Sequence, residues 1–335
     1  ILAMIGHLDG SGAVTFLICI PALLPLYDAL GMRRTTLATI VALGAGTMNI
    51  LPWGGPTIRA ASALGFENVT EFFMPVLVPV LVGLACVIAI AIFLGSREKK
   101  RLKGSLQVGG QYVAPELTEE EKALERPKLF WVNVILILAA IACLLFSGFA
   151  PAVVFMVFYV IATLINYPKV ADSKARVDAH AKSCLMMCSV LFAAGCFTGI
   201  MKGTGMITAM ANALVSIIPA SAAPVFPLII GVIAMPASLL FDPDSFYYGV
   251  LPVLATTASG LGIATASIGH AAILGQMTTG FPISPLTAAT FLLVGLSGVD
   301  LGEHQKKIIP WAWAVSLVML VVAIITGGVT LGGAA

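Results

Sequence analysis

The chain has 335 residues, of which 59% are hydrophobic and only 10% are charged, and its formal net charge is +2. Soluble domains carry roughly 25% charged residues, so this composition excludes a soluble globular protein and indicates an integral membrane protein. There is no acidic or basic tail, and the sparse aromatic residues are not interleaved with basic ones, so we expect no nucleic-acid partner.

Residues 1–65 are predicted to form a re-entrant hairpin followed by a broken membrane helix. An apolar run at 16–30 contains two prolines and is shorter than the roughly 20 residues that a spanning helix needs. This run favours one arm of a re-entrant hairpin, with a polar tip at Asp9 and Ser11. Because the chain begins on this hairpin at Ile1, without Met, we expect it to start partway through a longer protein, with the N-terminal part of a first repeat missing.

The membrane segment that follows, at 37–63, is interrupted by the run GAGTMNILPWGGPT at 44–57. Proline removes a backbone donor and clashes with the preceding turn, and glycine weakens a helix interior. In lipid, broken backbone is tolerated only where protein or a water-filled cavity satisfies the freed groups. We therefore expect an unwound stretch here that lines a site.

The middle of the chain alternates apolar and basic segments. Residues 66–95 are predicted to form a transmembrane helix, and 96–128 a loop rich in Lys and Arg. Short basic loops stay in the cytoplasm, which places 96–128 there, although binding of anionic lipid by the same charges is an alternative. Residues 129–182 are predicted to hold scaffold-type helices and, at 169–182, a basic helix that could lie on the membrane surface.

Residues 183–299 repeat the plan of residues 1–65. A second hairpin has its polar tip at 242–245, and a later membrane segment is broken by GQMTTGFPISPLT at 275–287. Four pairs of landmarks recur in the same order, each about 230 residues apart: Asp9 and Asp242, Pro21 and Pro252, Pro52 and Pro282, and Thr57 and Thr287. These features predict an internal repeat. Residues 300–335 are predicted to form a last transmembrane helix.

The basic residues set the orientation of the two repeats. With 96–128 in the cytoplasm, the first hairpin enters the membrane from the cytoplasm, and 169–182 is cytoplasmic again. The second hairpin then enters from outside, and the C-terminus lies outside. The repeats are therefore inverted, and inverted repeats with paired broken helices are typical of secondary transporters. We expect an all-α polytopic protein of the cell membrane.

The broken segments and the hairpin tips carry the candidate site residues. Half-helix N-termini attract anions, unwound carbonyls attract cations, and glycine lets backbone approach a ligand closely. The predicted substrate-binding residues are Thr47, Asn49, Gly54, Gly55, Thr57, Arg59, Gln276, Thr278, Thr279, Ser284 and Thr287. The residues predicted to couple protons or ions are Asp9, Ser11, Asp242, Asp244 and Ser245.

Each of these assignments has a structural alternative. The polar groups of the loops could serve only to repair the broken backbone, and the aspartates could serve only to cap helices at the tips. Arg59 could pair with a substrate carboxylate or simply with Asp9. His7 and His270 are candidate proton carriers, with a satisfied place in the packed core as the alternative.

Several motifs together carry a family resemblance. They are LPWGGPT at 51–57 with the earlier DGSG at 9–12 and PALLPLY at 21–27, FDPDSFYYGVLP at 241–252, and SPL at 284–286 with LLVGLSGVDLGEHQ at 292–305. In these motifs the chain resembles the CitMHS family of citrate–divalent metal:proton symporters, and the resemblance covers nearly the whole chain.

The resemblance implies uptake of citrate as a complex with Mg²⁺, Ca²⁺ or a similar metal, coupled to protons. The metal would travel with citrate, so no residues are assigned to it and no permanent cofactor is implied. The family lies in the ion transporter superfamily, whose sodium-coupled dicarboxylate carriers have inverted repeats and re-entrant hairpins, form homodimers and move a transport domain like an elevator. The implied partners are thus a citrate–metal complex, membrane lipid and a second copy of the chain.

Three other functions compete with this one. A sodium-coupled di- or tricarboxylate transporter of the same superfamily would need sodium and no divalent metal. An intramembrane aspartyl protease is disfavoured because Asp242 and Asp244 flank Pro243 and no Gly-x-Gly-Asp segment occurs; no serine or zinc hydrolase motif occurs either, so no enzyme is predicted. A channel is disfavoured because hairpins of opposite orientation favour alternating access.

Overall fold

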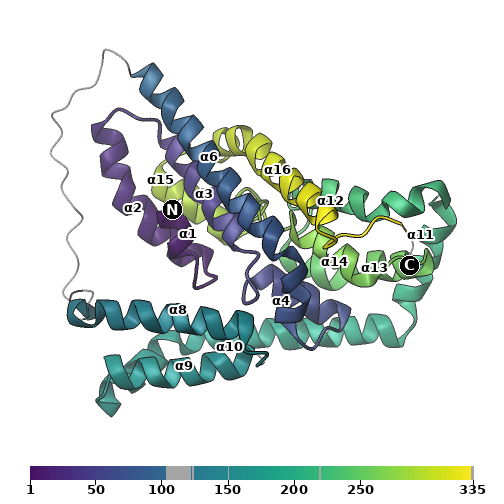
Figure 1. Cartoon of the computed structure of the whole chain (residues 1–335), viewed down its shortest axis with the longest axis horizontal. Coiled ribbons are helices and arrows are strands. Elements are labelled where there is room, and N and C mark those ends of the chain that lie inside the picture. Colours follow the sequence, from purple (N-terminus) through teal and green to yellow (C-terminus); the bar gives the residue numbers. More distant parts are fainter. Residues whose placement is uncertain (103–121, 123, 150, 219, 333–335) are drawn as a thin grey trace.

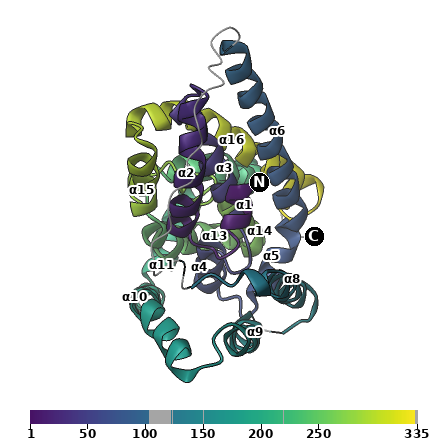
Figure 2. The same cartoon turned by 90° about the vertical axis from the view of Figure 1, so that its left-hand side faces the viewer.

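Helices make up every regular element in the part of the chain that the computed structural model describes, which comprises residues 1–102, 122, 124–149, 151–218 and 220–332. Most of the predicted basic loop at 96–128 lies outside these described residues. The helices from both ends of the chain form one block, and α8 (Phe130–Phe146), α9 (Pro151–Asn166) and α10 (Val170–Gly203) run along one side of it (Figures 1 and 2).

The N-terminal elements are a hairpin and a broken helix. α1 (Leu2–Gly6) and α2 (Gly12–Ala29) form the hairpin, and α3 (Arg34–Met48) and α4 (Gly55–Leu64) are the two halves of the broken helix. The unwound stretch is shorter than the sequence predicts, because the helix continues to Met48 and only 49–54 breaks it.

Close packing explains why the glycines before this break remain helical. Gly46 lies against the second broken segment, where a Cβ atom would stand 2.7 Å from the carbonyl oxygen of Thr278. The small residues of this run therefore allow two segments to touch, rather than unwinding the helix. The helix unwinds instead in the stretch that contains Pro52, because the proline nitrogen has no hydrogen to donate.

The second hairpin and the second broken helix have the same order. α12 (Phe226–Ala237) is the first arm, and the π-helical turn η4 (Ser245–Val250) with α13 (Leu251–Gly260) is the return arm. α14 (Thr265–Ile273) and α15 (Ala288–Ser297) are then separated by turns, as the sequence predicts for 275–287.

Several described helices are long and apolar enough to cross a membrane. Four stretches meet this criterion by length and composition: Gly12–Ala29, Val69–Arg101, Pro127–Phe146 and Leu301–Ile325. They contain α2, then α5 (Val69–Phe73), η1 (Met74–Val76) and α6 (Leu77–Arg101), then η2 (Pro127–Leu129) and α8, then α16 (Leu301–Ile325). The chain is thus a membrane protein with multiple candidate spans.

The region after α9 differs from the sequence-based expectation. Residues 169–182, which could have lain on the membrane surface, continue without interruption into the following apolar run as the single helix α10. No proline or glycine separates the two parts, so the change from charged to apolar residues does not end the helix. α10 ends at Gly203, and Gly205 follows with φ of 75°. α11 (Met206–Ile217) then lies at 67° to the last part of α10, before the short η3 (Ala220–Val225).

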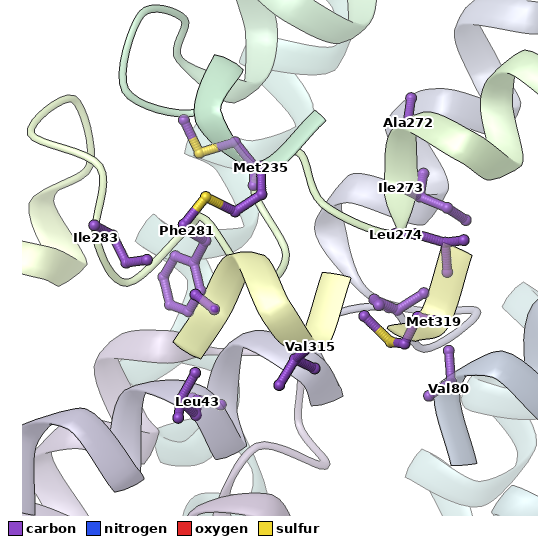
Figure 3. Packing of buried hydrophobic residues seen from close by; sticks show 14 of the residues in the cluster. Leu43, Val80, Met235, Ala272, Ile273, Leu274, Phe281, Ile283, Val315 and Met319 are labelled. Carbon is purple, nitrogen blue, oxygen red and sulfur yellow. The ribbon is translucent and has the colours of Figure 1, made fainter. Parts of the chain in front are cut away.

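The core joins the two ends of the chain. Leu43 of α3, Val80 of α6 and Val315 of α16 are buried together with Phe281 and other residues of the second broken segment (Figure 3). Each hairpin also packs across to the other half of the molecule. α2 contacts α15, while α13 and η4 contact α4, so each return arm lies against the second half of the other broken helix.

Candidate functional site

The tip of the first hairpin is tied to the first broken helix by two hydrogen bonds, one partly buried and one buried. The indole Nε1 of Trp53 donates a hydrogen bond to the carbonyl oxygen of Leu8 at 2.8 Å. The fully buried His7 ring lies between Thr15, 2.8 Å from Nδ1 to Oγ1, and Asn49, 3.3 Å from Nε2 to Oδ1. The position of this tip is therefore set by the unwound stretch at 49–54.

Asn49 also joins the two broken helices to each other. Its Nδ2 donates to the carbonyl oxygen of Met277 at 2.9 Å. This bond fixes the amide so that Oδ1 faces His7, and the Nε2 atom of His7 must then carry the hydrogen. Met277 itself has φ of 49°, and among the described residues it is the one non-glycine with a positive φ. Such a backbone persists only where its surroundings hold it in place.

The second hairpin holds Met277 from the other side. The Met277 backbone N–H donates to Ser238 Oγ at 2.9 Å, and Ser238 Oγ donates to Gln276 Oε1 at 3.0 Å. The hydroxyl of Tyr247, in η4, donates to the Gln276 carbonyl oxygen at 2.6 Å. A continuous set of buried hydrogen bonds thus runs from one hairpin through both broken helices to the other hairpin.

An ion pair closes the same region from the opposite hairpin. Arg59 Nε in α4 lies 2.8 Å from Asp244 Oδ1 at the second tip, and the exposed fractions of the two side chains are 12% and 44%. The sequence left Arg59 a choice between a substrate carboxylate and Asp9. The structure instead pairs it with Asp244, because the return arm of the second hairpin packs on α4.

A cavity of about 150 Å³ lies between these elements. Each tip and each broken segment contributes to its wall, together with Arg59. The lining residues are Gly10 and Gly12 from the first tip, Pro243 from the second, Asn49, Gly55, Pro56 and Arg59 from the first broken helix, and Met277, Phe281 and Thr287 from the second.

Several helices begin at this cavity. α2 starts at Gly12, α4 at Gly55, and α15 just after Thr287. The side chain of Ser11 caps α2, whereas no side chain caps α4 or α15. Uncapped helix N-termini carry partial positive charge and free N–H donors, so the cavity favours an anion.

The two glycines at the start of α4 play different parts. A Cβ atom at Gly54 would collide with the carbonyl oxygen of Asn49, so Gly54 lets the chain fold back on itself rather than approach a ligand. A Cβ at Gly55 would lie 2.8 Å from Arg59 Nη1. Gly55 therefore makes room for the guanidinium at the cavity wall.

Four of the predicted substrate residues reach the cavity, namely Asn49, Gly55, Arg59 and Thr287. The others face elsewhere. Thr47 packs beside Gly83 of α6, and the buried hydroxyls of Thr47, Thr57, Thr278 and Thr279 have no hydrogen-bond partner among the described residues. The Oε1 and carbonyl oxygen of Gln276 are bonded within the protein as described above, whereas its buried Nε2 has no partner among the described residues. Ser284 Oγ accepts from the Leu286 N–H within its own turn.

The residues predicted for ion coupling form the two tips. Asp9 Oδ1 accepts from the Ser11 N–H at 2.8 Å, and Asp242 accepts from the N–H and the hydroxyl of Ser245 at 2.7 and 3.0 Å. Both aspartates thus organise the start of a return arm. Within the described residues, no group of three or more His, Cys, Asp and Glu lies close enough to hold a metal ion.

His270, the second candidate proton carrier, lies away from the cavity. Its Nδ1 is 2.7 Å from the Gly328 carbonyl oxygen, and its Nε2 is 2.7 Å from that of Phe72. The ring therefore fastens the segment after α16 to α5. The sequence reasoning also missed Met277 and Phe281 as cavity residues, since apolar side chains in a polar loop give no sign of facing a ligand.

Comparisons with known proteins agree with an anion carrier. The family model described as CitMHS, citrate transporter, matches residues 1–275. The chain is 44% identical over 327 residues to a protein of Bacillus subtilis (strain 168) named citrate transporter, covering 98% of this chain and 75% of the relative. It is 39% identical over 332 residues to the Mg(2+)/citrate complex secondary transporter of the same organism, covering 99% and 76%. The uncharacterized transporter YraO is 36% identical over 339 residues, covering 99% and 76%.

Proposed function

The chain belongs to the CitMHS family of citrate transporters, and on that premise we propose that it carries citrate as a complex with a divalent metal ion, coupled to protons. A secondary transporter of citrate is not an enzyme, so the task of the site is to bind, enclose and release its cargo. A relative named for the Mg(2+)/citrate complex supports the metal as part of that cargo.

One observation carries this proposal, namely the charge balance of the cavity between the hairpin tips. Arg59 contributes one positive charge, and its partner Asp244 cancels it. The two uncapped N-termini, of α4 and α15, add about half a charge each, or about +1 together. Fully ionised citrate carries three negative charges, and a bound divalent cation reduces them to one. The site therefore matches the metal complex better than free citrate.

Within the cavity, the citrate carboxylates would contact Arg59, the N-terminus of α4 at Gly55 and the N-terminus of α15 at Thr287. The Thr287 hydroxyl bonds to the Phe281 carbonyl oxygen at 3.0 Å, which orients this end of the second loop. Asn49 and the apolar Phe281 would complete the enclosure. Thr57 and Ser284 would contribute if the loops rearrange around bound citrate.

Proton coupling would involve the tips. Asp9 or Asp242 would take up and release the proton, with Ser11, Asp244 and Ser245 beside them. The capping contacts of the two aspartates support a link between protonation and tip geometry, because a protonated carboxyl group is a weaker acceptor for the N–H groups of the return arm.

The finer architecture also belongs to the proposal. The two hairpin–broken helix units would be inverted repeats within a transport domain that includes 1–65 and 183–299. The helices of 129–182 would then be a scaffold on which that domain moves like an elevator in a homodimer. The reciprocal packing of α2 on α15 and of α13 on α4 supports the repeat. We propose an orientation with 96–128 cytoplasmic and the C-terminus outside.

A sodium-coupled carrier of di- or tricarboxylates is the second candidate. It draws on the buried hydroxyls of Thr47, Thr278 and Thr279, which lack partners among the described residues. Buried oxygen atoms beside unwound backbone suit a small cation. This candidate requires sodium in place of the divalent metal.

Uptake of labelled citrate into proteoliposomes separates the two candidates. The assay compares Mg²⁺ present, Mg²⁺ removed by a chelator, and sodium replaced by choline. The metal-complex proposal expects uptake to fall when Mg²⁺ is removed and to be unchanged without sodium. Uptake that persists without divalent metal but stops without sodium would establish the second candidate instead.

A further inference from the structure

A second polar cavity, of about 300 Å³, lies at the other end of α3. The N-terminus of α3, the last turns of α6 and the first turns of α16 form its walls, and these three helices pack together (Figure 1). α3 has 15 residues, so at about 1.5 Å per residue its two ends are about 22 Å apart. This cavity is therefore separate from the candidate citrate site.

Four cationic side chains and one carboxylate line this cavity: Arg33, Arg97, Arg101, Lys307 and Glu98. Glu98 is only 5% exposed, and its negative charge is paired with Arg101. It accepts hydrogen bonds from Nε and Nη2 of Arg101 at 3.0 and 2.8 Å and from the Thr36 hydroxyl at 3.1 Å. These bonds fix Arg101 and leave the cavity with a formal charge of +3.

The other three cations have no carboxylate within ion-pair distance in the described part of the chain. Lys307 Nζ, half-buried, donates to the hydroxyls of Thr35 and Thr36, which are neutral acceptors. Arg97 lies with its guanidinium carbon 5.9 Å from the centre of the Phe93 ring. Cations that converge on a cavity with a net positive charge favour a bound anion. Guanidinium groups pair geometrically with phosphate oxygens in particular.

Apolar side chains beside the cavity point to the source of that phosphate. Leu94 lines it, Phe93 is 48% exposed, and the Phe93 ring packs on Trp311 at 5.7 Å between centroids. This strip belongs to α6 and α16, which are both candidate membrane spans. Basic pockets between membrane helices bind anionic lipid headgroups, and their acyl chains need an apolar surface next to the pocket.

We infer that the cavity formed by α3, α6 and α16 binds the phosphate group of an anionic phospholipid, through Arg33, Arg97 and Lys307, while the acyl chains lie along Phe93 and Trp311. Arg97 comes from α6, Lys307 from α16, and Arg33 from the N-cap position of α3. A bound headgroup therefore links α3, which leads to the citrate site, to the spanning helices α6 and α16.

Native mass spectrometry and lipid titration of the detergent-solubilised full chain test this site. Phosphatidylglycerol should remain bound and phosphatidylcholine should not. Arg33→Gln and Arg97→Gln, both at exposed positions, should each raise the dissociation constant for phosphatidylglycerol about fivefold. Arg34→Gln is the matched control, since Arg34 is adjacent in sequence but pairs with Asp28 at 2.7 Å outside the cavity. Binding that is unchanged in Arg33→Gln and Arg97→Gln, or equally weakened in Arg34→Gln, would overturn the inference.

Inorganic phosphate separates a lipid from a free anion. If a lipid is the occupant, millimolar phosphate should neither displace phosphatidylglycerol nor raise the thermal unfolding midpoint as phosphatidylglycerol does. If phosphate alone displaces the lipid and gives the same shift, lost in Arg33→Gln, the lipid assignment is wrong and the site takes free phosphate. Phosphatidylcholine also carries a phosphate, but its choline cation makes the headgroup neutral overall. An equal shift with phosphatidylcholine would therefore contradict a site for an anionic headgroup, since it would show that bulk lipid stabilises the chain.

Discussion

Arg59 and Asp244 are separated by 185 positions in the sequence, yet they meet at 2.8 Å between Nε and Oδ1. The pair connects the second half of the first broken helix to the tip of the second hairpin. It borders the cavity in which we propose that citrate binds, so on that proposal Asp244 would compete with a citrate carboxylate for the same guanidinium. The exchange of one carboxylate for another would link citrate binding to the position of the hairpin tip.

Asp244→Asn tests this competition. Removal of the charge frees Arg59, and because the pair is partly exposed the gain is modest. We expect the KM for citrate to fall by up to about fivefold. Initial rates of uptake into proteoliposomes measure it, with Arg59→Gln as the opposite case. A rise in KM for Asp244→Asn would show that Asp244 helps to bind the cargo instead.

The same substitution should change the requirement for metal. Asp244→Asn raises the formal charge of the cavity by one, which suits citrate with less of its charge neutralised. We expect the ratio of uptake with Mg²⁺ to uptake without it to be smaller in Asp244→Asn than in the parent chain. Asp300→Asn, which alters the N-cap of α16 outside the cavity, is the control. An unchanged ratio in Asp244→Asn would contradict the charge-matching argument.

Gly55→Ala and Gly54→Ala separate a binding effect from a folding effect. The Cβ of Gly55→Ala meets the mobile end of Arg59, which can move aside, so the protein should fold but bind citrate more weakly. The Cβ of Gly54→Ala meets backbone carbonyl groups that cannot move aside, so this variant should lose thermal stability. Melting curves and uptake assays on both variants measure the difference. Equal loss of stability in both would contradict the separate parts assigned to the two glycines.

Asn49→Ala should destabilise the whole centre of the molecule. It leaves the Met277 carbonyl oxygen and the Nε2–H of His7 without partners, and each buried unpaired group costs roughly 1–3 kcal/mol. The unfolding free energy should therefore fall by about 2–6 kcal/mol. Asn68→Ala, which removes the N-cap of α5 and an exposed hydrogen bond to Glu71, should cost about 1 kcal/mol. Similar unfolding midpoints for the two variants would argue against the buried hydrogen-bond network.

Asp242→Asn tests proton coupling without loss of the cap. Asparagine caps helices about as well as aspartate, so the return arm should keep its start at Ser245 and its stability. If Asp242 carries the proton, the number of protons taken up per citrate should fall in Asp242→Asn and stay constant in Asp300→Asn. Unchanged proton uptake in Asp242→Asn, repeated in Asp9→Asn, would remove both tips from the coupling mechanism.

The order of hairpin and broken helix at the two ends of the chain could be predicted from the sequence, because helix breaks are marked by proline. Pro52 and Pro282 cannot continue a helical hydrogen-bond ladder, and both lie in the observed breaks. Glycine is a weaker signal, because it occurs both where a helix unwinds and where a helix packs closely on another segment. Gly46 remains helical because Thr278 packs on it, and only the partner segment reveals that reason.

The partners within the site could not be predicted from sequence. Asp9 and Asp244 are equivalent as carboxylates at tips, and the choice between them for Arg59 depends on which return arm packs on α4. Met277 reaches the cavity because its backbone is held at φ of 49° by Asn49 and Ser238, residues on two other segments. Thr47 was predicted to bind substrate, yet it lies on the face of α3 that packs beside Gly83.

Equilibrium binding of labelled citrate to the purified chain in the presence of Mg²⁺ tests the central claim most directly. Arg59→Gln should raise the dissociation constant for citrate about 10- to 100-fold, because a charged hydrogen bond contributes roughly 1.5–3 kcal/mol. Arg34→Gln, far from the cavity, should bind as the parent chain does. If Arg59→Gln folds with an unchanged melting curve and still binds the Mg²⁺–citrate complex with the parent affinity, the cavity between the hairpin tips is not the citrate site.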